Sequence, residues 1–129
     1  MIHVLDTHTI VWALEDSARL SAAAKHVLMD PNSTLVVPSI VLAEIWHLHQ
    51  RRPTKPSMAD ALASIARLAN CVVQSLDEEV LRHLPVGLGI HDAIIVATAL
   101  LWREVHHHDV RLVTCDQAIQ GGHWVEVLW

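Results

Sequence analysis

Short apolar runs alternate along this chain with longer stretches in which apolar residues recur at helical spacing. The runs have the length of buried strands, and polar residues, prolines or glycines bound them. They predict strands at residues 2–5, 34–37, 71–74, 110–114 and 124–128. Strands that alternate with helices predict a three-layer α/β/α sandwich with a mainly parallel central sheet. The pattern does not give the order of the strands.

The stretches between these strands predict helices, and the clearest is HDAIIVATALLWR at residues 91–103. Ser21 and Ser39 are expected N-caps, because a serine side chain accepts hydrogen bonds from the first free backbone N–H groups of a helix. Gly121 and Gly122 are expected to form a turn. The other predicted helices cover residues 7–14, 20–28, 40–50, 57–68, 77–84 and 116–120.

Length and composition favour a single domain, residues 1–129. A chain of 129 residues is long enough to bury roughly two thirds of its unfolded surface. No apolar run approaches the ~20 residues that cross a bilayer, and no secretory signal pattern opens the chain. We therefore expect a cytoplasmic protein without a membrane partner. Cys71 and Cys115 have no disulfide-framework spacing, so both are expected to be reduced.

The formal net charge is -5 with histidine neutral, which argues against binding nucleic acid through bulk positive charge. A polyanionic substrate would require metal ions or a local basic patch. Arg51, Arg52 and Lys55 lie in a predicted polar loop with two prolines. This loop is a candidate for contact with an RNA backbone. A plain solvated loop explains the same residues equally well.

Three aspartates lie where a strand or loop passes into a predicted helix: Asp6, Asp92 and Asp116. Asp6 directly follows the first strand, and ligands of open α/β sheets gather at the carboxyl ends of the strands. Each aspartate taken alone could be a helix N-cap, since Asp is among the best capping residues. The three positions therefore need further support before they indicate a site.

Glu44 supplies that support. Its neighbours one helical turn away include Ile40, Val41 and Leu48, and a carboxylate on such a face is costly unless it is paired or bound to a cation. A solvated helix edge stays an alternative. Lys and Arg total only nine, so a divalent cation is the economical partner for clustered acids.

Carboxylate oxygens are hard ligands that suit Mg²⁺ or Mn²⁺ rather than Zn²⁺. Such ions bind well together with substrate phosphates, which indicates phosphate-ester chemistry. The metal would polarise a phosphoryl oxygen and supply a hydroxide-like nucleophile. The number of ions, one or two, stays open.

The 11 histidines add little to this set. His8 and His91 flank the acids closely enough to touch a substrate, although a packing or supporting role explains them better. The run at residues 106–108 is expected to be a solvated turn that can bind nickel or zinc adventitiously.

Other enzyme classes fit poorly. Residues 6–9 resemble the start of haloacid-dehalogenase-type phosphatases, but His8 stands where that pattern needs a second Asp. The Gly87-Leu88-Gly89 segment follows no clear strand, and Asp92 replaces the third glycine of a dinucleotide fingerprint. No Walker loop or nucleophile elbow occurs. We therefore expect no nucleotide cofactor.

Five segments together resemble the successive signatures of PIN-domain proteins and, more narrowly, VapC-type toxins of type II toxin-antitoxin pairs. The similarity runs nearly from end to end of the chain. The segments are residues 4–8 with Trp12, 39–45, 90–99, 112–116 and 125–129.

This resemblance implies a Mg²⁺- or Mn²⁺-dependent endoribonuclease whose four acidic positions match Asp6, Glu44, Asp92 and Asp116. Thr7 and Thr114 match hydroxyl positions that often support metal waters in the family. The resemblance also implies an RNA substrate, a homodimer, and a cognate antitoxin whose C-terminal segment covers the site. A PIN-like binding module without catalytic activity, acting only within a protein complex, is the alternative. The presence of all four acids favours the enzyme.

Overall fold

The computed structural model describes residues 1–107 and 109–129. Its centre is a five-stranded sheet in which every paired neighbour is parallel, in the order β3-β2-β1-β4-β5. The expected mainly parallel sheet is therefore confirmed, with β1 in the middle. The strands are β1 (Ile2–Leu5), β2 (Thr34–Pro38), β3 (Cys71–Gln74), β4 (Val110–Val113) and β5 (Glu126–Leu128).

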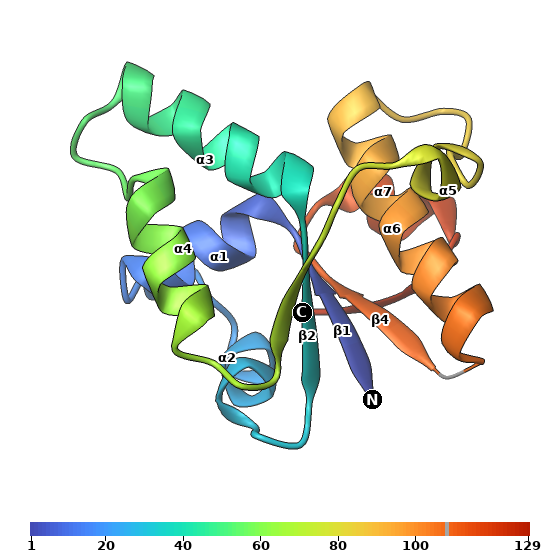
Figure 1. Ribbon diagram of the computed structural model, residues 1–129, viewed down its shortest axis with the longest axis horizontal. Coiled ribbons are helices and arrows are strands. Elements are labelled where there is room, and N and C mark those ends of the chain that lie inside the picture. The colour runs from blue at the N-terminus through green and yellow to red at the C-terminus, as the bar shows by residue number, and fades with distance from the viewer. Residues whose placement is uncertain (108) are drawn as a thin grey trace.

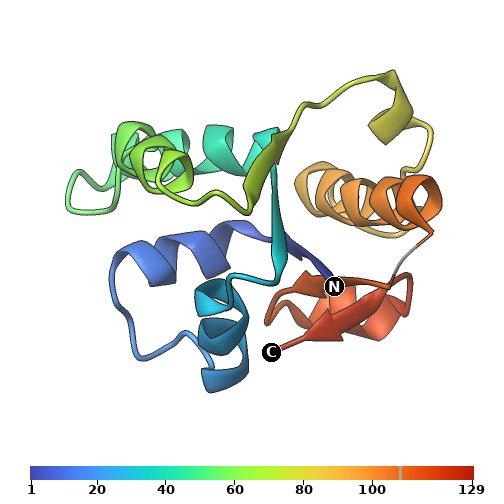
Figure 2. The same cartoon turned by 60° about the horizontal axis from the view of Figure 1, so that its bottom comes forward.

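Helices cover both faces of this sheet, as Figure 1 shows. One group, α1 to α4, lies on one side, and the other, α5 to α7, lies on the opposite side; a second view agrees (Figure 2). This arrangement is the expected three-layer sandwich. The helices are α1 (Thr7–Leu14), α2 (Ala22–Met29), α3 (Ser39–Arg51), α4 (Met58–Ala66), α5 (Glu78–Leu81), α6 (Ile90–His106) and α7 (Gln117–Gly122).

The inner strands are buried at nearly every position, because a parallel sheet has helices on both faces. Val4, Val36 and Leu112 are each fully buried and come from the three central strands. The edge strand β3 is different, since Val72 and Val73 stay about two-fifths exposed (41% and 40%). None of the helices in the described ranges is long and apolar enough to cross a membrane. Cys71 and Cys115 are free thiols, as expected.

Helix starts agree only partly with the sequence. Ser21 caps α2, accepting a hydrogen bond from the N–H of Ala24 at 3.0 Å. The expected cap at Ser39 is wrong, because Ser39 is the first residue of α3 and Pro38 occupies the N-cap position without a side-chain bond. The Ser39 hydroxyl instead accepts a hydrogen bond from the N–H of Leu76 at 3.0 Å. It therefore joins α3 to the segment that follows β3.

Several predicted boundaries shift. Helix α5 is only Glu78–Leu81, much shorter than residues 77–84, and α4 ends at Ala66 rather than at residue 68. Helix α6 continues beyond residue 103 to His106, so His106 is helical rather than part of a turn. His107 follows it in a left-handed conformation (φ 52°), and His108 lies outside the described residues.

The expected turn at Gly121 and Gly122 is also wrong, because both residues belong to α7. A β-carbon at Gly122 would lie 1.8 Å from a ring carbon of Trp124. The indole therefore packs directly over the backbone of Gly122, and only glycine permits that approach. The chain leaves α7 at His123, whose φ is 56°.

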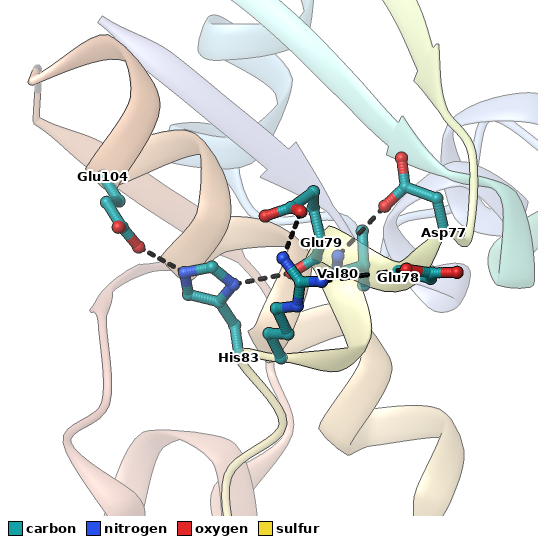
Figure 3. Close-up of polar contacts among 7 residues, drawn as sticks. Asp77, Glu78, Glu79, Val80, His83 and Glu104 are labelled. Atoms are coloured by element: carbon teal, nitrogen blue, oxygen red, sulfur yellow. Dashed lines mark hydrogen bonds and ion pairs between the residues drawn. The ribbon is translucent and has the colours of Figure 1, made fainter.

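A small polar network fastens the short helix α5 to α6 (Figure 3). Asp77 caps α5, accepting a hydrogen bond from the N–H of Val80 at 3.0 Å. The ring of His83 donates through Nδ1 to the carbonyl oxygen of Glu79 at 2.7 Å, and its Nε2 contacts the carboxylate of Glu104 on α6. The bond to Glu104, helped by the Glu79 carbonyl, raises the pKa of His83 above its usual value. His83 follows α5 directly, so this contact joins the chain just beyond α5 to the last turn of α6.

Candidate active site

The four acids singled out from the sequence line one cavity of about 560 Å³. Asp6 follows β1 and Asp116 follows β4, whereas Glu44 comes from α3 and Asp92 from the first turn of α6. β1 and β4 are parallel neighbours with Leu5 opposite Val113, so their carboxyl ends meet at the same edge. The cavity is lined by Asp6, Thr7, His8, Trp12, Glu44, Asp92, Ile95, Cys115, Asp116 and Gln117.

Asp6 is the most buried of the four acids, at 6% exposure. Its Oδ1 accepts a hydrogen bond from the N–H of Thr9 at 2.8 Å, so Asp6 is the N-cap of α1. Its Oδ2 accepts a hydrogen bond from the hydroxyl of Thr114. Both oxygens are thus fixed in place, and the carboxylate is oriented before any ligand binds.

Thr9 is a supporting residue that the sequence reasoning missed. Its hydroxyl is fully buried and lies 2.7 Å from Oδ1 of Asp6 and 2.8 Å from the carbonyl oxygen of Val113. A hydroxyl has one proton, so it donates to one of these two acceptors at a time. Thr9 lies three residues after the N-cap Asp6, at the N3 position from which polar side chains often bond back to the N-cap residue. That spacing could have identified Thr9.

Thr114 connects two of the acids. Its oxygen accepts a hydrogen bond from the N–H of Asp116 at 3.0 Å while its proton is donated to Asp6. Asp116 in turn caps α7, because its Oδ1 accepts from the N–H of Ile119 at 2.9 Å. The capping interpretation is therefore correct for Asp6 and Asp116, and both carboxylates still face the cavity.

Asp92, in contrast to Asp6 and Asp116, does not cap a helix. It is the third residue of α6, and the N-cap residue of that helix is Gly89, which has no side chain. Burial raises the pKa of Asp92, and the negative charges of Asp116 and Asp6 raise it further. The capping interpretation is thus wrong for Asp92. Its charge is unfavourable in the metal-free protein.

Glu44 has a similar environment. Its side chain is 25% exposed, and Nδ1 of His91 lies 4.0 Å from its Oε1. Within the described part of the chain, neither Oε1 of Glu44 nor the hydroxyl oxygen of Thr7 has a regular hydrogen-bond partner. Burial raises the pKa of Glu44, and the nearby Thr7 hydroxyl and His91 offset only part of that rise.

These features fit a hydrated hard cation better than a compact metal cluster. The donors are carboxylate and hydroxyl oxygens, and two of them are buried without hydrogen-bond partners among the described residues. Across residues 1–107 and 109–129, no three His, Cys, Asp or Glu side chains converge as a ready ligand set. Mg²⁺ keeps several waters and commonly uses only one or two carboxylates, so it does not need such a set.

Of the remaining candidate residues, the two threonines lie at or behind the cavity and the three basic residues do not. Thr7 is buried and lines the cavity, while Thr114 lies behind Asp6 and acts through it. Arg51, Arg52 and Lys55 lie at or beyond the end of α3, a helix whose first half carries Glu44, and they are not among the cavity residues. The Lys55 ammonium already pairs with Glu15 at 3.0 Å. The basic loop is therefore not brought to the acids.

A three-layer fold with carboxylates gathered at the carboxyl edge of a parallel sheet defines the class of this protein as an α/β domain with an acidic site. The PIN-domain family model matches residues 3–121. The chain therefore belongs to the PIN-domain family.

Solved structures with a similar fold cover almost the whole chain. VapBC2 from Rickettsia felis, bound to a DNA fragment from its promoter, has a TM-score of 0.69 and 18% identity over 99% of this chain and 98% of that chain. VapBC-1 from nontypeable Haemophilus influenzae has a TM-score of 0.67 and 20% identity over 99% and 97%. A toxin-antitoxin complex from Klebsiella pneumoniae has a TM-score of 0.63 and 17% identity over 98% and 96%. Comparison with curated proteins returned no match.

Proposed function

We propose that this chain is a VapC-type toxin, a metal-dependent endoribonuclease that hydrolyses RNA phosphodiester bonds. One observation carries the proposal: Asp6, Glu44, Asp92 and Asp116 line a single cavity at the carboxyl edge of the sheet. Membership of the PIN-domain family supports the same reaction class.

The four acids have different proposed roles because their surroundings differ. Asp6 and Asp92 are the principal ligands of Mg²⁺ or Mn²⁺, and Asp116 is a peripheral one. A bound divalent cation supplies polarisation of the phosphoryl oxygen and activation of water. Glu44 serves as a further ligand or as the base that positions the attacking water. Thr9 and Thr114 hold the Asp6 carboxylate still, which preserves its orientation toward the cavity.

Cleavage of RNA in the presence of Mg²⁺ or Mn²⁺ tests the proposal. Asp92→Asn should abolish cleavage while the variant stays folded, and Asp6→Asn should do the same. Asp16→Asn is a matched control, because Asp16 is exposed, lies outside the cavity and has a positive φ that Asn tolerates. Wild-type protein that cuts none of the transfer, messenger or ribosomal RNA classes would instead favour an inactive PIN-like binding module.

The proposal includes a cognate antitoxin, a homodimer and a cytoplasmic site of action. The similar structures described as VapBC or toxin-antitoxin complexes support the antitoxin. A small reading frame next to this one, encoding a DNA-binding fold, is the expected partner gene. Co-expression should yield a complex in which RNA cleavage is suppressed. Light scattering of the isolated chain should give a mass of about twice 14.4 kDa.

A further inference from the structure

We propose that four side chains beside the acidic cavity form a stacking site for an unpaired RNA base. They are His8, Trp12 and Trp129, together with Arg19, and we call them the aromatic ladder. The inference rests on the proposed ribonuclease function and adds to it a place where the substrate is held.

The ladder is a continuous set of ring contacts. The ring centroids of His8 and Trp12 are 5.3 Å apart at an angle of 44°, and those of Trp12 and Trp129 are 5.6 Å apart at 59°. The guanidinium carbon of Arg19 lies 5.9 Å from the centroid of Trp12, within range of a cation–π contact. Trp12 and Trp129 are half-buried against the core, so their positions are set by packing. His8 is exposed and provides the open end of the set.

The ladder borders the proposed reaction site. His8 and Trp12 line the same cavity as the four acids, and His8 is two residues from Asp6 on the first turn of α1. A base that rests on the His8 ring would therefore bring a neighbouring phosphate of the same strand close to the carboxylates.

Charge explains why such a site is needed. The chain carries a net charge of -5, and its cavity is acidic, so bulk electrostatics opposes the approach of RNA. Stacking on aromatic rings contributes about 1–3 kcal/mol per base and does not depend on charge. Arg19 is exposed and forms no ion pair with the residues that the structure describes, which leaves it available to a phosphate.

The ladder also favours unpaired RNA over duplex. Bases inside a duplex are already stacked on one another, whereas bases of loops and single strands can stack on protein rings. The basic loop at Arg51, Arg52 and Lys55 offers no comparable set of rings. Lys55 there is held by Glu15.

Binding of a short single-stranded RNA that contains 2-aminopurine tests the ladder, with EDTA present to prevent cleavage and at about pH 8, above the ordinary titration range of histidine side chains. We expect His8→Ala to weaken binding about 5- to 150-fold, the equivalent of 1–3 kcal/mol, with an unchanged salt dependence. Arg19→Gln should weaken binding and reduce the slope of log K against log salt by about 0.7. The 2-aminopurine fluorescence should be quenched by wild-type protein and less so by His8→Ala.

Matched controls are His26→Ala and Arg67→Gln, two exposed residues that are neither in the ladder nor among the cavity residues. Both should bind like wild type. If wild-type protein cleaves RNA but the ladder variants bind it equally well, the inference is wrong and the proposed function stands. If wild-type protein neither binds nor cleaves RNA, both fail. Ladder variants that keep RNA affinity but lose the antitoxin would assign this surface to the protein partner and overturn the inference.

Discussion

The hydroxyl of Thr114 donates a hydrogen bond to Oδ2 of Asp6, a residue 108 positions earlier in the chain. The same oxygen accepts a hydrogen bond from the N–H of Asp116 at 3.0 Å. One buried side chain at the end of β4 thereby orients two acids that belong to different strand ends.

Replacing Thr114 by Val keeps the shape of the side chain and removes both hydrogen bonds. Because Asp6 would then have a buried oxygen without a donor, we expect the free energy of unfolding to fall by about 1–3 kcal/mol. RNA cleavage should fall with it, since Asp6 loses its fixed orientation. Urea unfolding at neutral pH measures the first effect. Thr114→Ser is the control because it keeps the hydroxyl; equal losses in the two variants would mean that packing, not the hydrogen bond, is responsible.

Asp92→Asn should stabilise the metal-free protein. The pKa of Asp92 is raised in the folded state, so the folded protein holds this proton more tightly than the unfolded chain does. The ionised carboxylate therefore lowers stability at neutral pH, and its removal should raise the melting temperature by a few degrees. Thermal unfolding in EDTA checks this. A lower melting temperature for Asp92→Asn would contradict the crowding of charge at this position.

Mn²⁺ should stabilise wild-type protein, because a ligand that binds only the folded state shifts the unfolding equilibrium. At a concentration about 100 times the dissociation constant the gain is about 2.7 kcal/mol, which corresponds to roughly 10 °C in a domain of this size. The melting temperature of Asp92→Asn should respond much less. An unchanged wild-type melting curve at millimolar Mn²⁺ would count against a metal site.

Glu44→Gln separates catalysis from stability. Oε1 of Glu44 lacks a regular hydrogen-bond partner among the described residues, and burial raises the pKa of this carboxyl. An uncharged amide avoids that cost, so the metal-free variant should be as stable as wild type or more so. Cleavage should fall by about 10²–10⁴-fold if Glu44 acts as a base. A large loss of metal-free stability would show instead that Glu44 is structural.

His3 should make the protein sensitive to acid. It is 3% exposed in β1, and neither ring nitrogen has a partner among the described residues. Burial, reinforced by the positive charge of Arg111, lowers its pKa below the usual 6.5. Below about pH 6.5 the unfolded chain therefore binds more protons than the folded one, and the free energy of unfolding falls as the pH decreases. His3→Leu should reduce this fall in urea titrations; an identical pH profile would exclude His3 as its source.

His83 should have the opposite effect on the pH dependence of stability, because it stabilises the protein at low pH rather than at high pH. The contact with Glu104 raises its pKa, so its stabilising effect is complete below about pH 6.5 and is lost as the pH rises through the folded-state pKa. The Glu104 side chain is 69% exposed, which limits the effect of Glu104→Gln to at most about 1 kcal/mol. The difference in unfolding free energy between wild type and this variant should shrink from about pH 6 to about pH 9. A difference that does not change with pH would rule out the ionised pair.

The sequence predicted the layers and the strands because both depend on local patterning. The short apolar runs at residues 2–5 and 71–74 became strands with the same bounds. Strand order was out of reach, because pairing of β1 with β4 joins segments more than 100 residues apart. Ser39 shows where local sequence signals fail. It is a good capping residue by type, but its hydroxyl accepts a hydrogen bond from the N–H of Leu76, which lies far away in the sequence.

The site shows the same difference between features set by local sequence and features set by long-range contacts. Asp6, Glu44, Asp92 and Asp116 could be selected from their positions in predicted elements, and the structure brings them to one cavity. The role of Thr9 depends on its contacts with Asp6 and with Val113 on another strand, and only the folded chain supplies the second. Arg51 and Arg52 were candidates because they are basic residues in a predicted polar loop, and the structure places them at the C-terminal end of α3, outside the cavity.

The middle position of β1 in the sheet has a further consequence for how the site unfolds. We expect the sheet to fray first at its edge strands, β3 and β5, because β1 has a hydrogen-bonded neighbour on each side. The amide protons of β1 should consequently exchange with solvent only when the whole domain unfolds. Asp6, which directly follows β1, should therefore keep its position even when the edge strands open locally.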